Sequence, residues 1–557
     1  MKRSNIFTSL FLAALVITCI FGGLMPADAA SRKSFPDVGK HYWAANSILS
    51  LANYGIISGN AEGKFKPTAN LRRSELAKLL TTAFIYSKSP QVPAFSDVEP
   101  NHWAAGFIST VIEQDLVDGF PDNTFRPNAV ATRVQLAKIL VKVKGYSTSN
   151  VSAQTFEDVG SGYWGYRYVQ TAAKNNLISG YSDGTFRPNA QITRAEAAAL
   201  IYRALLNKDY LLERSSANQV TCERYRRFTG AGPMNINVLK VPKAAPVSIK
   251  LGLAKDRVAA RERLSSMAKR KGAIAGVNAD FFSLKTGGPS GLMVDDQILS
   301  SPINNRSYFG ILPDKTCFVD RASMSASVTA ATGRAGIIAW LNKYRDRDSD
   351  TIYAYTPFYG PSTLTEDTGT EVTIRIDGPV TPSSELTGTV ISVQHGGNSP
   401  IPLNCIVLSA DSGSGRNYLD GTMRVGDTIN LKFYLNPWQS GAMAIGGGPR
   451  LVRAGQVNVE REAFDSSQVK GRGPRTGIGI DPQGNLIVEV IDGRSDCFSI
   501  GMTLAELAAD LKSRGAVDAM NFDSGGSSTL YFNGDIYNYP SDGSERSISN
   551  AILFVPN

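Results

Sequence analysis

Histidine and cysteine are scarce in this sequence, with three and five residues among 557. After residue 213 there is one histidine, His395. A multi-histidine zinc site is therefore excluded there, and a Ser-His-Asp triad would depend wholly on that residue. Neither GxSxG nor GxxxxGK[ST] occurs, which argues against a hydrolase nucleophile elbow and a nucleotide-binding P-loop.

Long apolar runs are also rare, because the sequence has one, at its N-terminus. Basic residues at positions 2 and 3 precede an apolar stretch over 6–24, and small residues follow at 27–30. This layout is typical of a secretory signal, over residues 1–30, that is cleaved after residue 29 or 30. A retained N-terminal anchor is the alternative. We predict an exported chain with no membrane span after cleavage.

Clusters of like charge are absent as well. The formal net charge is +9, but Lys and Arg are scattered, so nucleic acid is a weak candidate partner and an anionic wall polymer suits an exported chain better. The four cysteines beyond the signal contain no CxxC pair, which disfavours zinc ribbons. By a slight margin we expect two disulfides, instead of buried thiols, among Cys222, Cys317, Cys405 and Cys497.

Three tandem repeats fill most of the first 210 residues. Each opens with Phe-x-Asp-Val, at 35–38, 95–98 and 156–159, and a Trp, a Gly, a Phe-(Lys/Arg)-Pro segment and an Arg recur in the same register. The matched residues include Asp37, Asp97 and Asp158, Trp43, Trp103 and Trp164, and Arg73, Arg133 and Arg194. A period this long with several matched positions indicates tandem supersecondary units.

Each repeat is predicted to hold two helices around a Gly/Pro loop. In the first repeat, apolar residues at 44, 48, 51 and 52 form one helical stripe, and those at 76, 79, 80, 83 and 84 form another. Thr132 with Gln135 and Thr193 with Glu196 predict capping boxes, whereas the first repeat has Arg72 in place of threonine. The arginine that follows opposes the helix dipole. We expect it to complete an anion site with the free N–H groups there, with a plain surface arginine as the alternative.

These motifs resemble the S-layer homology (SLH) family over about residues 31–210. The resemblance implies an all-α pseudo-trimer, a helical bundle that binds pyruvylated secondary cell-wall polysaccharide at the cell wall or S-layer surface. The arginine of each repeat would meet the pyruvyl carboxylate, and the Asp and Trp would line the same groove. The implied wall-binding residues are Asp37, Trp43, Arg73, Asp97, Trp103, Arg133, Asp158, Trp164 and Arg194.

The region from 213 to 557 has short alternating strands, such as 372–376, separated by Gly, Asp, Asn and Pro turns. One helix is strongly indicated, because Thr503 and Glu506 form a capping box and Gly515 ends the apolar stripe. Strands over 486–491 and 517–522 flank it, which suggests a parallel crossover. Asp492 and Asp523 would then lie at the same carboxyl edge of neighbouring strands, where ligands gather. Two ordinary turns are the alternative.

Six segments of this region resemble, in order, the phosphodiester glycosidase family, which includes the lysosomal uncovering enzyme that removes N-acetylglucosamine from a sugar-phosphate-sugar diester. The segments are 277–282, 445–449, 475–479, 490–494, 501–507 and 521–528. Two departures stand out, because the family usually reads NGG where Asn278-Ala279-Asp280 stands and DGGGSS where Asp523-Ser524-Gly525-Gly526-Ser527-Ser528 stands. A positive φ at Ser524 would strain the backbone. Asp280 adds a carboxylate that would alter substrate choice.

The resemblance implies a hydrolase that cleaves the bond between an anomeric carbon and a phosphodiester oxygen. Asp523, with Asp492 second, would activate water or stabilise the oxocarbenium-like centre, and Arg475 with Arg494 would hold the phosphate. The phosphodiester is a stable anionic leaving group, so charge stabilisation would outweigh its protonation. Further predicted substrate-binding residues are Asn278, Asp280, Gly447, Gly448, Thr476, Asn521, Gly525, Gly526, Ser527 and Ser528.

Two other functions stay open at this point. A calcium-dependent phosphodiesterase would use the same carboxylates to cut the P–O bond, although no cofactor or metal site is firmly predicted. A polysaccharide-binding module without turnover is the second alternative. The predicted organisation is multidomain: SLH repeats over 31–90, 91–151 and 152–212, then an α+β, strand-rich glycosidase domain over 213–557.

Overall fold

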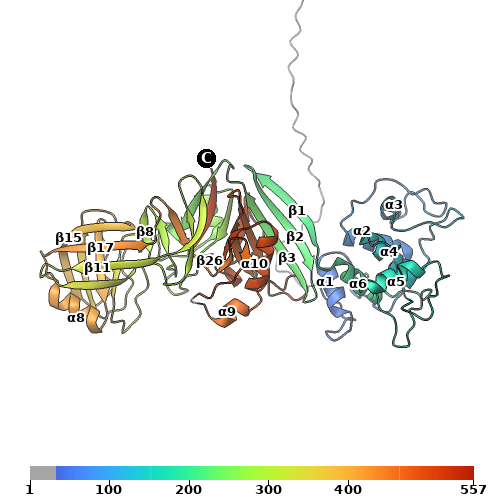
Figure 1. Ribbon diagram of the computed structural model, residues 1–557, viewed down its shortest axis with the longest axis horizontal. Coiled ribbons are helices and arrows are strands. Elements are labelled where there is room, and N and C mark those ends of the chain that lie inside the picture. The colour runs from blue at the N-terminus through green and yellow to red at the C-terminus, as the bar shows by residue number, and fades with distance from the viewer. Residues whose placement is uncertain (1–32, 150, 152–153, 463) are drawn as a thin grey trace, which may run out of the picture.

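The computed structural model describes residues 33–149, 151, 154–462 and 464–557. The predicted signal segment lies outside these residues. The N-terminal repeats form a group of helices at one end of an elongated molecule, the strand-rich sheets lie in the middle, and a barrel lies at the other end (Figure 1). No helix among the described residues is long and apolar enough to cross a membrane.

Each repeat contributes two helices. They are α1 (Ala45–Asn53), α2 (Arg73–Ala83), α3 (Ala105–Glu113), α4 (Arg133–Val143), α5 (Tyr166–Lys174) and α6 (Arg194–Leu205). Both predicted apolar stripes face the core, and the capping boxes at Thr132 and Thr193 are confirmed. In the first repeat the Arg72 N–H still donates to the Glu75 carboxylate at 2.8 Å, so half of the box survives without threonine.

Short backbone contacts join the three repeats in a cycle. Leu71 N–H donates to Ile192 O, Ile192 N–H to Ala131 O, and Ala131 N–H to Leu71 O, at 2.9, 3.0 and 2.9 Å. These residues precede the second helix of each repeat. The region therefore combines helices with isolated β-bridges between repeats, such as the one that joins Arg72 to Val130.

The C-terminal region begins with three long antiparallel strands, β1 (Asp209–Ala217), β2 (Val220–Phe228) and β3 (Pro233–Val241). They enter an eight-stranded sheet of order β1-β2-β3-β22-β21-β23-β19-β20. Its later strands are β19 (Arg450–Arg453), β20 (Gln456–Val457), β21 (Arg475–Ile480), β22 (Leu486–Ile491) and β23 (Asp518–Asn521). Helix α10 (Leu504–Ser513) contacts β19, β20, β21 and β23 of this sheet.

The predicted crossover is partly wrong. Both β22 and β23 pair antiparallel with β21, so they run in the same direction, but β21 lies between them and they are not neighbours. The physical reason is that the Arg475–Ile480 segment satisfies the hydrogen-bonding edges of both strands. Asp492 and Asp523 still follow the same ends of these strands.

A five-stranded sheet of order β25-β24-β6-β27-β4 meets the large sheet. Its strands are β4 (Val247–Leu253), β6 (Ala275–Asn278), β24 (Leu530–Phe532), β25 (Asp535–Ile536) and β27 (Asn550–Pro556). Apolar side chains of both sheets share one core, which includes Val277, Val488, Phe522 and Ile552. Beside this sheet lie a short 3₁₀ turn η1 (Ala254–Asp256), helix α7 (Leu264–Arg270), and a pair of two-residue strands, β5 (Glu262–Arg263) and β26 (Ser547–Ile548).

A closed barrel is inserted before the last third of the region, and no sequence pattern predicted it as a separate unit. Its strand order is β11-β12-β13-β16-β14-β15-β17, and its helix is α8 (Gly413–Thr422). The strands are β11 (Ser323–Thr329), β12 (Ala335–Leu341), β13 (Ile352–Tyr355), β14 (Thr370–Ile376), β15 (Ser383–His395), β16 (Cys405–Ala410) and β17 (Thr428–Asn436). His395 lies exposed on this barrel, with Nδ1 3.2 Å from Thr370 Oγ1.

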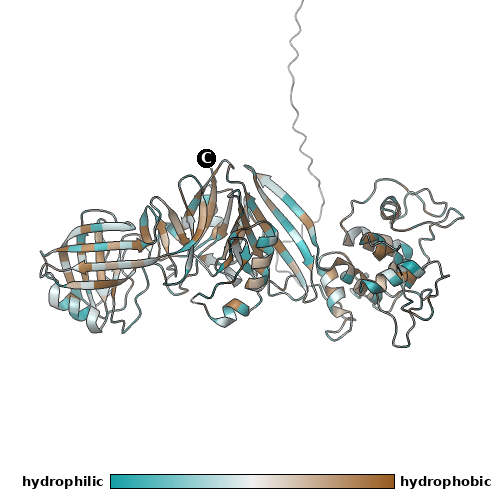
Figure 2. Ribbon diagram, viewed as in Figure 1, coloured by the Kyte–Doolittle hydropathy of each residue, from teal (hydrophilic) through white to brown (hydrophobic). Residues whose placement is uncertain are grey.

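Another five-stranded sheet, of order β10-β9-β18-β7-β8, connects the barrel to the centre. Its strands are β7 (Met293–Asp295), β8 (Gln297–Ser300), β9 (Ser307–Ile311), β10 (Cys317–Arg321) and β18 (Met443–Gly446). Helix α9 (Ser466–Lys470) and the 3₁₀ turn η2 (Gly525–Ser527) complete the elements. Alternating hydropathy along the barrel strands fits one face packed inward and one outward (Figure 2).

The disulfide expectation is wrong for this structure. Cys222, Cys317 and Cys405 are buried thiols on strands of three different sheets, and Cys497 lies in a loop. The three buried side chains serve as small apolar groups in the packed interior, which needs no cross-link. Burial raises the pKa of the Cys317 thiol to about 12, so the reactive thiolate is disfavoured.

The helical region packs directly on the strands that follow it. Tyr54 donates from its hydroxyl to Phe498 O at 2.6 Å, and Tyr202 donates to Thr229 O at 3.1 Å. Arg226, which is 2% exposed, donates to Ala83 O at 2.8 Å. This junction is therefore built from aromatic and buried polar contacts.

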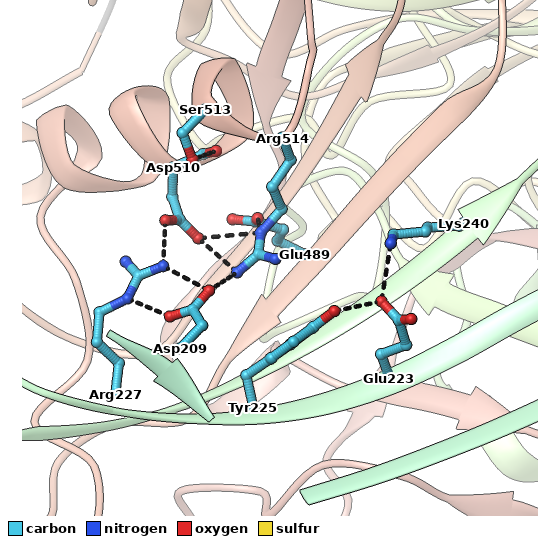
Figure 3. Close-up of polar contacts among 9 residues, drawn as sticks. All are labelled: Asp209, Glu223, Tyr225, Arg227, Lys240, Glu489, Asp510, Ser513 and Arg514. Carbon is cyan, nitrogen blue, oxygen red and sulfur yellow. Dashed lines mark hydrogen bonds and ion pairs between the residues drawn. The ribbon is translucent and has the colours of Figure 1, made fainter. Parts of the chain in front are cut away.

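An ion network joins strands β1 and β2 of the eight-stranded sheet to β22 and to helix α10 (Figure 3). Asp209 of β1 pairs with Arg227 of β2 and, at 2.8 Å, with Arg514 at the end of α10. Arg514 also pairs with Glu489 of β22, a fully buried carboxylate. The network links Asp209, at the start of the strand-rich region, to Arg514, 305 positions later in the chain.

Candidate functional site

The ends of β6 and β23 are held together by backbone and amide hydrogen bonds. Asp523 N–H donates to Ala279 O at 2.7 Å, and Asn278 Nδ2 donates to Asp523 O at 2.7 Å. Asn278 Oδ1 accepts from Thr476 Oγ1 at 2.8 Å and from Thr529 N–H at 3.0 Å. Asn278 is thus the connector between the two sheets, and Thr476 supports it.

These bonded ends of β6 and β23 form a seam between the two sheets, and Asp523 is the carboxylate at its centre. Its Oδ1 accepts from Ser524 N–H at 2.8 Å. Burial raises the pKa of Asp523 to about 6, against the lowering effect of a hydrogen bond from Ser527. A carboxylate with this pKa can be ionised near neutral pH and can accept a proton in a reaction.

A glycine turn follows Asp523 directly. Gly525, not Ser524, takes the left-handed backbone, with φ of +70°, while Ser524 has φ of −127°. The condition for strain at Ser524, a positive φ, is therefore not met, because its backbone is extended and an extended backbone accepts any residue. The Ser524 hydroxyl donates to Phe522 O at 3.1 Å, so this departure from the glycine pattern fits locally.

Two arginines lie over this turn. Arg494 donates to Ser541 Oγ at 3.2 Å and to Asp542 at 3.3 Å. Arg546 pairs with the same Asp542 at 2.6 Å and approaches Ser527 Oγ at 3.4 Å. A Cβ added to Gly526 would lie 2.1 Å from the Arg546 guanidinium, so glycine is required for this approach. Arg546 and Asp542 stand outside every motif of the sequence, which left no signal to find them.

Arg475 points elsewhere. It donates to three main-chain carbonyls, Met502 at 3.0 Å, Gln468 at 3.2 Å and Gly471. Burial lowers its pKa to about 10. The structure therefore uses Arg475 to hold the loop beside α9 and the entry to α10, and does not bring it to the glycine turn. Only Arg494, of the two predicted phosphate-binding arginines, lies there.

Asp492 is 2% exposed and fully hydrogen-bonded. Asn235 and Asn538 donate to its oxygens, the latter at 3.1 Å, and Tyr539 N–H donates at 3.0 Å. Burial raises its pKa to about 6. Asn538 also donates to Ser528 O at 3.1 Å. Asp492 thus fixes the segment behind the glycine turn, and Asp523 is the better placed of the two for chemistry.

The remaining predicted residues support the seam. Asn521 Nδ2 donates to Gly448 O at 2.9 Å, and Gly448 N–H donates to Asn521 O at 2.7 Å. A Cβ on Gly447 would lie 2.6 Å from Met520 Cε, so this backbone approach needs glycine. Asp280 is buried beside Gly291 and Gly446. The structure brings these residues to one region, together with Ser527 and Ser528.

The repeat arginines are used in the same way three times. Arg73 Nε donates to Phe125 O, Arg133 to Phe186 O and Arg194 to Phe65 O, at 2.9, 2.8 and 2.9 Å. Each arginine therefore binds the loop of another repeat. The first helical N–H groups are also taken, since Arg73 N–H donates to Ala129 O and Ser74 N–H to Pro127 O. The expectation of free N–H groups at these helix starts is wrong, because carbonyls of a neighbouring repeat occupy them.

The repeat aspartates close their own loops. Asp37 accepts from Phe65 and Lys66 N–H groups at 2.9 and 2.6 Å, and Asp97 and Asp158 make the matching bonds. The tryptophans are different, because Trp43, Trp103 and Trp164 are 63%, 52% and 57% exposed. A pocket of about 180 Å³ is lined by residues that include Lys78, Trp103 and Arg194. It draws on all three repeats.

Among the described residues, no group of three or more His, Cys, Asp or Glu side chains gathers in a metal-binding arrangement. The candidate site consists of one carboxylate, Asp523, beside a glycine turn and two arginines. This arrangement defines the class of site, in which a carboxylate lies beside cations and main-chain N–H groups that suit an anionic ligand.

Comparison with known families makes this specific. The S-layer homology domain matches at residues 34–77, 94–137 and 155–198, and the phosphodiester glycosidase family matches at 384–555. The chain carries three S-layer homology domains followed by a phosphodiester glycosidase domain, and it is a secreted, cell-wall-anchored protein. Asn278 and Asp280 lie before the glycosidase match.

Curated relatives match part of the chain. The cellulosome-anchoring protein of Acetivibrio thermocellus is 37% identical over 159 residues, 27% of this chain and 35% of that protein. The S-layer protein of Bacillus licheniformis is 28% identical over 224 residues, 40% of this chain and 25% of that protein. The chain thus spans about a third or less of the length of these relatives.

One solved structure shares the fold of the larger part of the chain. A hypothetical protein from Synechocystis has a TM-score of 0.52 and 24% identity, and the match covers 62% of this chain and 64% of that one. At this identity the likeness shows the fold alone.

Proposed function

We propose that this protein hydrolyses a sugar-1-phosphodiester in wall polysaccharide, such as an N-acetylglucosamine-1-phosphodiester, by breaking the bond between C1 and the phosphate oxygen. The observation that carries this proposal is the placement of Asp523 next to a glycine turn that Arg494 and Arg546 cover. The family match over 384–555 supports the same class of reaction.

The two arginines suit an anionic phosphodiester. Guanidinium groups bind phosphate oxygens through charge-assisted hydrogen bonds, and glycine N–H groups can add to them. Asp542 holds both arginines in place from the other side. Charge that develops on the departing phosphodiester would be stabilised here, so the leaving group needs little protonation.

Asp523 then has the role of base. It takes a proton from the attacking water as the new C1–O bond forms, and the electron pair of the old C1–O bond leaves with the phosphate. Asn278 and Thr476 keep the backbone of Asp523 at the seam. Asp492 supports the neighbouring segment and does not contact the reacting atoms.

We also propose that the repeats bind a pyruvylated secondary cell-wall polymer. The pocket that includes Lys78, Trp103 and Arg194 offers cations for a carboxylate and an aromatic face for a sugar. Since Arg194 spends its Nε and Nη2 on carbonyls, Lys78 is the more available cation. Binding at this pocket would hold the glycosidase domain close to the wall polysaccharide that contains its proposed substrate.

The deciding experiment identifies the products. Incubation of the purified protein with wall polymers should release a free reducing sugar and leave a phosphomonoester on the other fragment. Phosphate retained on the released sugar would instead show P–O cleavage, the calcium-type alternative, and chelator sensitivity would support it. Binding of wall polymer without release of any fragment would favour a binding module.

A further inference from the structure

A loop of the inserted barrel reaches the candidate site. Lys343, which follows β12, donates from Nζ to the carbonyls of Pro289, Ser290 and Gly291 at 2.9, 2.7 and 2.9 Å. Gly291 in turn donates its N–H to Asp280 Oδ2. The barrel therefore holds the backbone segment that holds the Asp280 carboxylate.

Asp280 is fixed at the seam with little room. It is 2% exposed, and its N–H donates to Asn550 Oδ1 at 2.7 Å. A Cβ on Gly446 would lie 2.9 Å from Asp280 Cγ, so the carboxylate is packed against bare backbone. Its Oδ1 has no hydrogen-bond partner among the described residues. A buried oxygen of this kind depends on nearby charge.

The charged groups around Asp280 come from several elements. Burial raises the pKa of the Asp280 carboxylate above its ordinary value, and Lys343 and Arg306 oppose this rise. Arg306 also faces Glu462. The charge of Asp280 adds to the effect of burial and raises the pKa of Asp523, whereas Arg546 lowers the pKa of Asp523. Arg494 and Asp542 complete the charges near the glycine turn. Burial lowers the pKa of Lys343 to about 7, against the raising effect of Asp280, so Lys343 is the barrel's cation in the range where Asp523 titrates.

We propose that Lys343 is a positioning residue of the glycosidase site, which acts through Asp280 on the ionisation of Asp523, so that the inserted barrel is a working part of the enzyme. The contacts that carry it are the three carbonyl bonds of Lys343, the Gly291–Asp280 bond, and the 2.7 Å bond from Asp523 N–H to the carbonyl of Ala279, the residue before Asp280. This proposal rests on the proposed function for its catalytic consequence.

The first test is the pH dependence of kcat/KM for sugar release in Lys343→Met, Asp280→Asn and the double variant. Loss of the cation should move the acid limb to lower pH by up to about one unit, because Asp280 without its counter-ion stays protonated and no longer opposes the ionisation of Asp523. Asp280→Asn is isosteric, keeps an acceptor for Gly291, and removes the neighbour that opposes Asp523 ionisation. Its limb should move to lower pH. The double variant should resemble Asp280→Asn.

Lys432→Met is the matched control, because Lys432 pairs with Glu385 on the outer surface of the same barrel. It should leave the acid limb unchanged. A Lys343→Met shift that persists in full in the Asp280→Asn background, or shifts of the two single variants in opposite directions, would overturn the proposal. If Lys343→Met does not fold, Lys343→Arg, which keeps the charge, should keep the wild-type limb.

Thermal unfolding at neutral pH gives a readout without substrate. The melting temperature lost in Lys343→Met should be smaller when Asp280 is already asparagine, because the lysine then has no buried carboxylate to neutralise. Equal losses in both backgrounds would contradict the link between these residues. If the wild-type protein releases no sugar, the proposed function fails, and this coupling still decides whether Lys343 acts through Asp280.

Discussion

The arginines of the repeats and the arginines of the glycosidase site are used in opposite ways. Arg73, Arg133 and Arg194 recur at a conspicuous motif position, yet each donates to carbonyls of another repeat. Arg494 and Arg546 lie over the glycine turn and share one carboxylate. An arginine at a repeated motif position can therefore stabilise the fold, whereas an arginine outside any motif, such as Arg546, can complete a binding site.

The largest effect should come from the carboxylate beside those site arginines. Asp523→Asn should lower kcat/KM for sugar release by about 10²–10⁴-fold, because the water loses its base. Wall binding should be unchanged, since the repeats are untouched. Initial rates on wall polymer and a sedimentation assay with purified walls measure the two properties. Retained turnover would show that another group is the base.

Changes at Arg546 and at Arg475 should affect different properties, activity for the first and stability for the second. Arg546→Gln should lower kcat/KM about 10- to 100-fold at unchanged stability, because a phosphate contact is lost. Arg475→Gln should instead lower the free energy of unfolding by about 3 kcal/mol, because three carbonyls lose a charged donor. Denaturant unfolding and steady-state kinetics separate the two. Identical behaviour of both variants would break the comparison.

Within the repeats the same separation should appear. Arg133, which is 7% exposed and pairs with Glu196 at 3.1 Å, should cost about 3 kcal/mol of stability when changed to Met. Trp43→Ala should leave stability within about 0.5 kcal/mol and weaken wall binding roughly tenfold. Unfolding and wall sedimentation check both. A strong loss of stability in Trp43→Ala would mean that this exposed ring has a packing role.

The pH profile should have an acid limb near the pKa of Asp523. Because burial raises that pKa to about 6, the ionised base is lost as pH falls through 6, and kcat/KM should fall about tenfold per pH unit below it. At higher pH the rate should level off. A limb near pH 4 would indicate a solvated carboxylate.

The smallest effect concerns the cysteines. Because the structure holds them as thiols, a reductant should leave the melting temperature of the intact protein unchanged. Thermal unfolding with and without dithiothreitol measures this. A drop of several degrees on reduction would restore the disulfide expectation.

The repeats could be read from the sequence because their motif period and their helical stripes are local signals. The capping boxes at Thr132 and Thr193 appear as predicted. The use of their arginines could not be read, because each guanidinium finds its carbonyl partner in another repeat. Helical spacing says which residues share a face, and does not say which neighbour that face meets.

In the glycosidase region the strand at 486–491, the helix after Thr503 and the common edge of Asp492 and Asp523 were predictable. The interposed β21 and the inserted barrel were not, because both depend on pairings between distant segments. Arg546 reached the site in the same way, through a turn that follows β25. Lys343 lies near the site because it follows β12, a strand of the inserted barrel.

The packed junction between the repeats and the strands has a mechanical consequence. Tyr54, Tyr202 and Arg226 bond across it, where a flexible tether would leave the two parts independent. A tethered enzyme sweeps a sphere around its attachment point, whereas a docked one works in a single direction at one reach. The wall polymer that the repeats are proposed to bind would therefore also determine which bonds lie within reach of the glycosidase site.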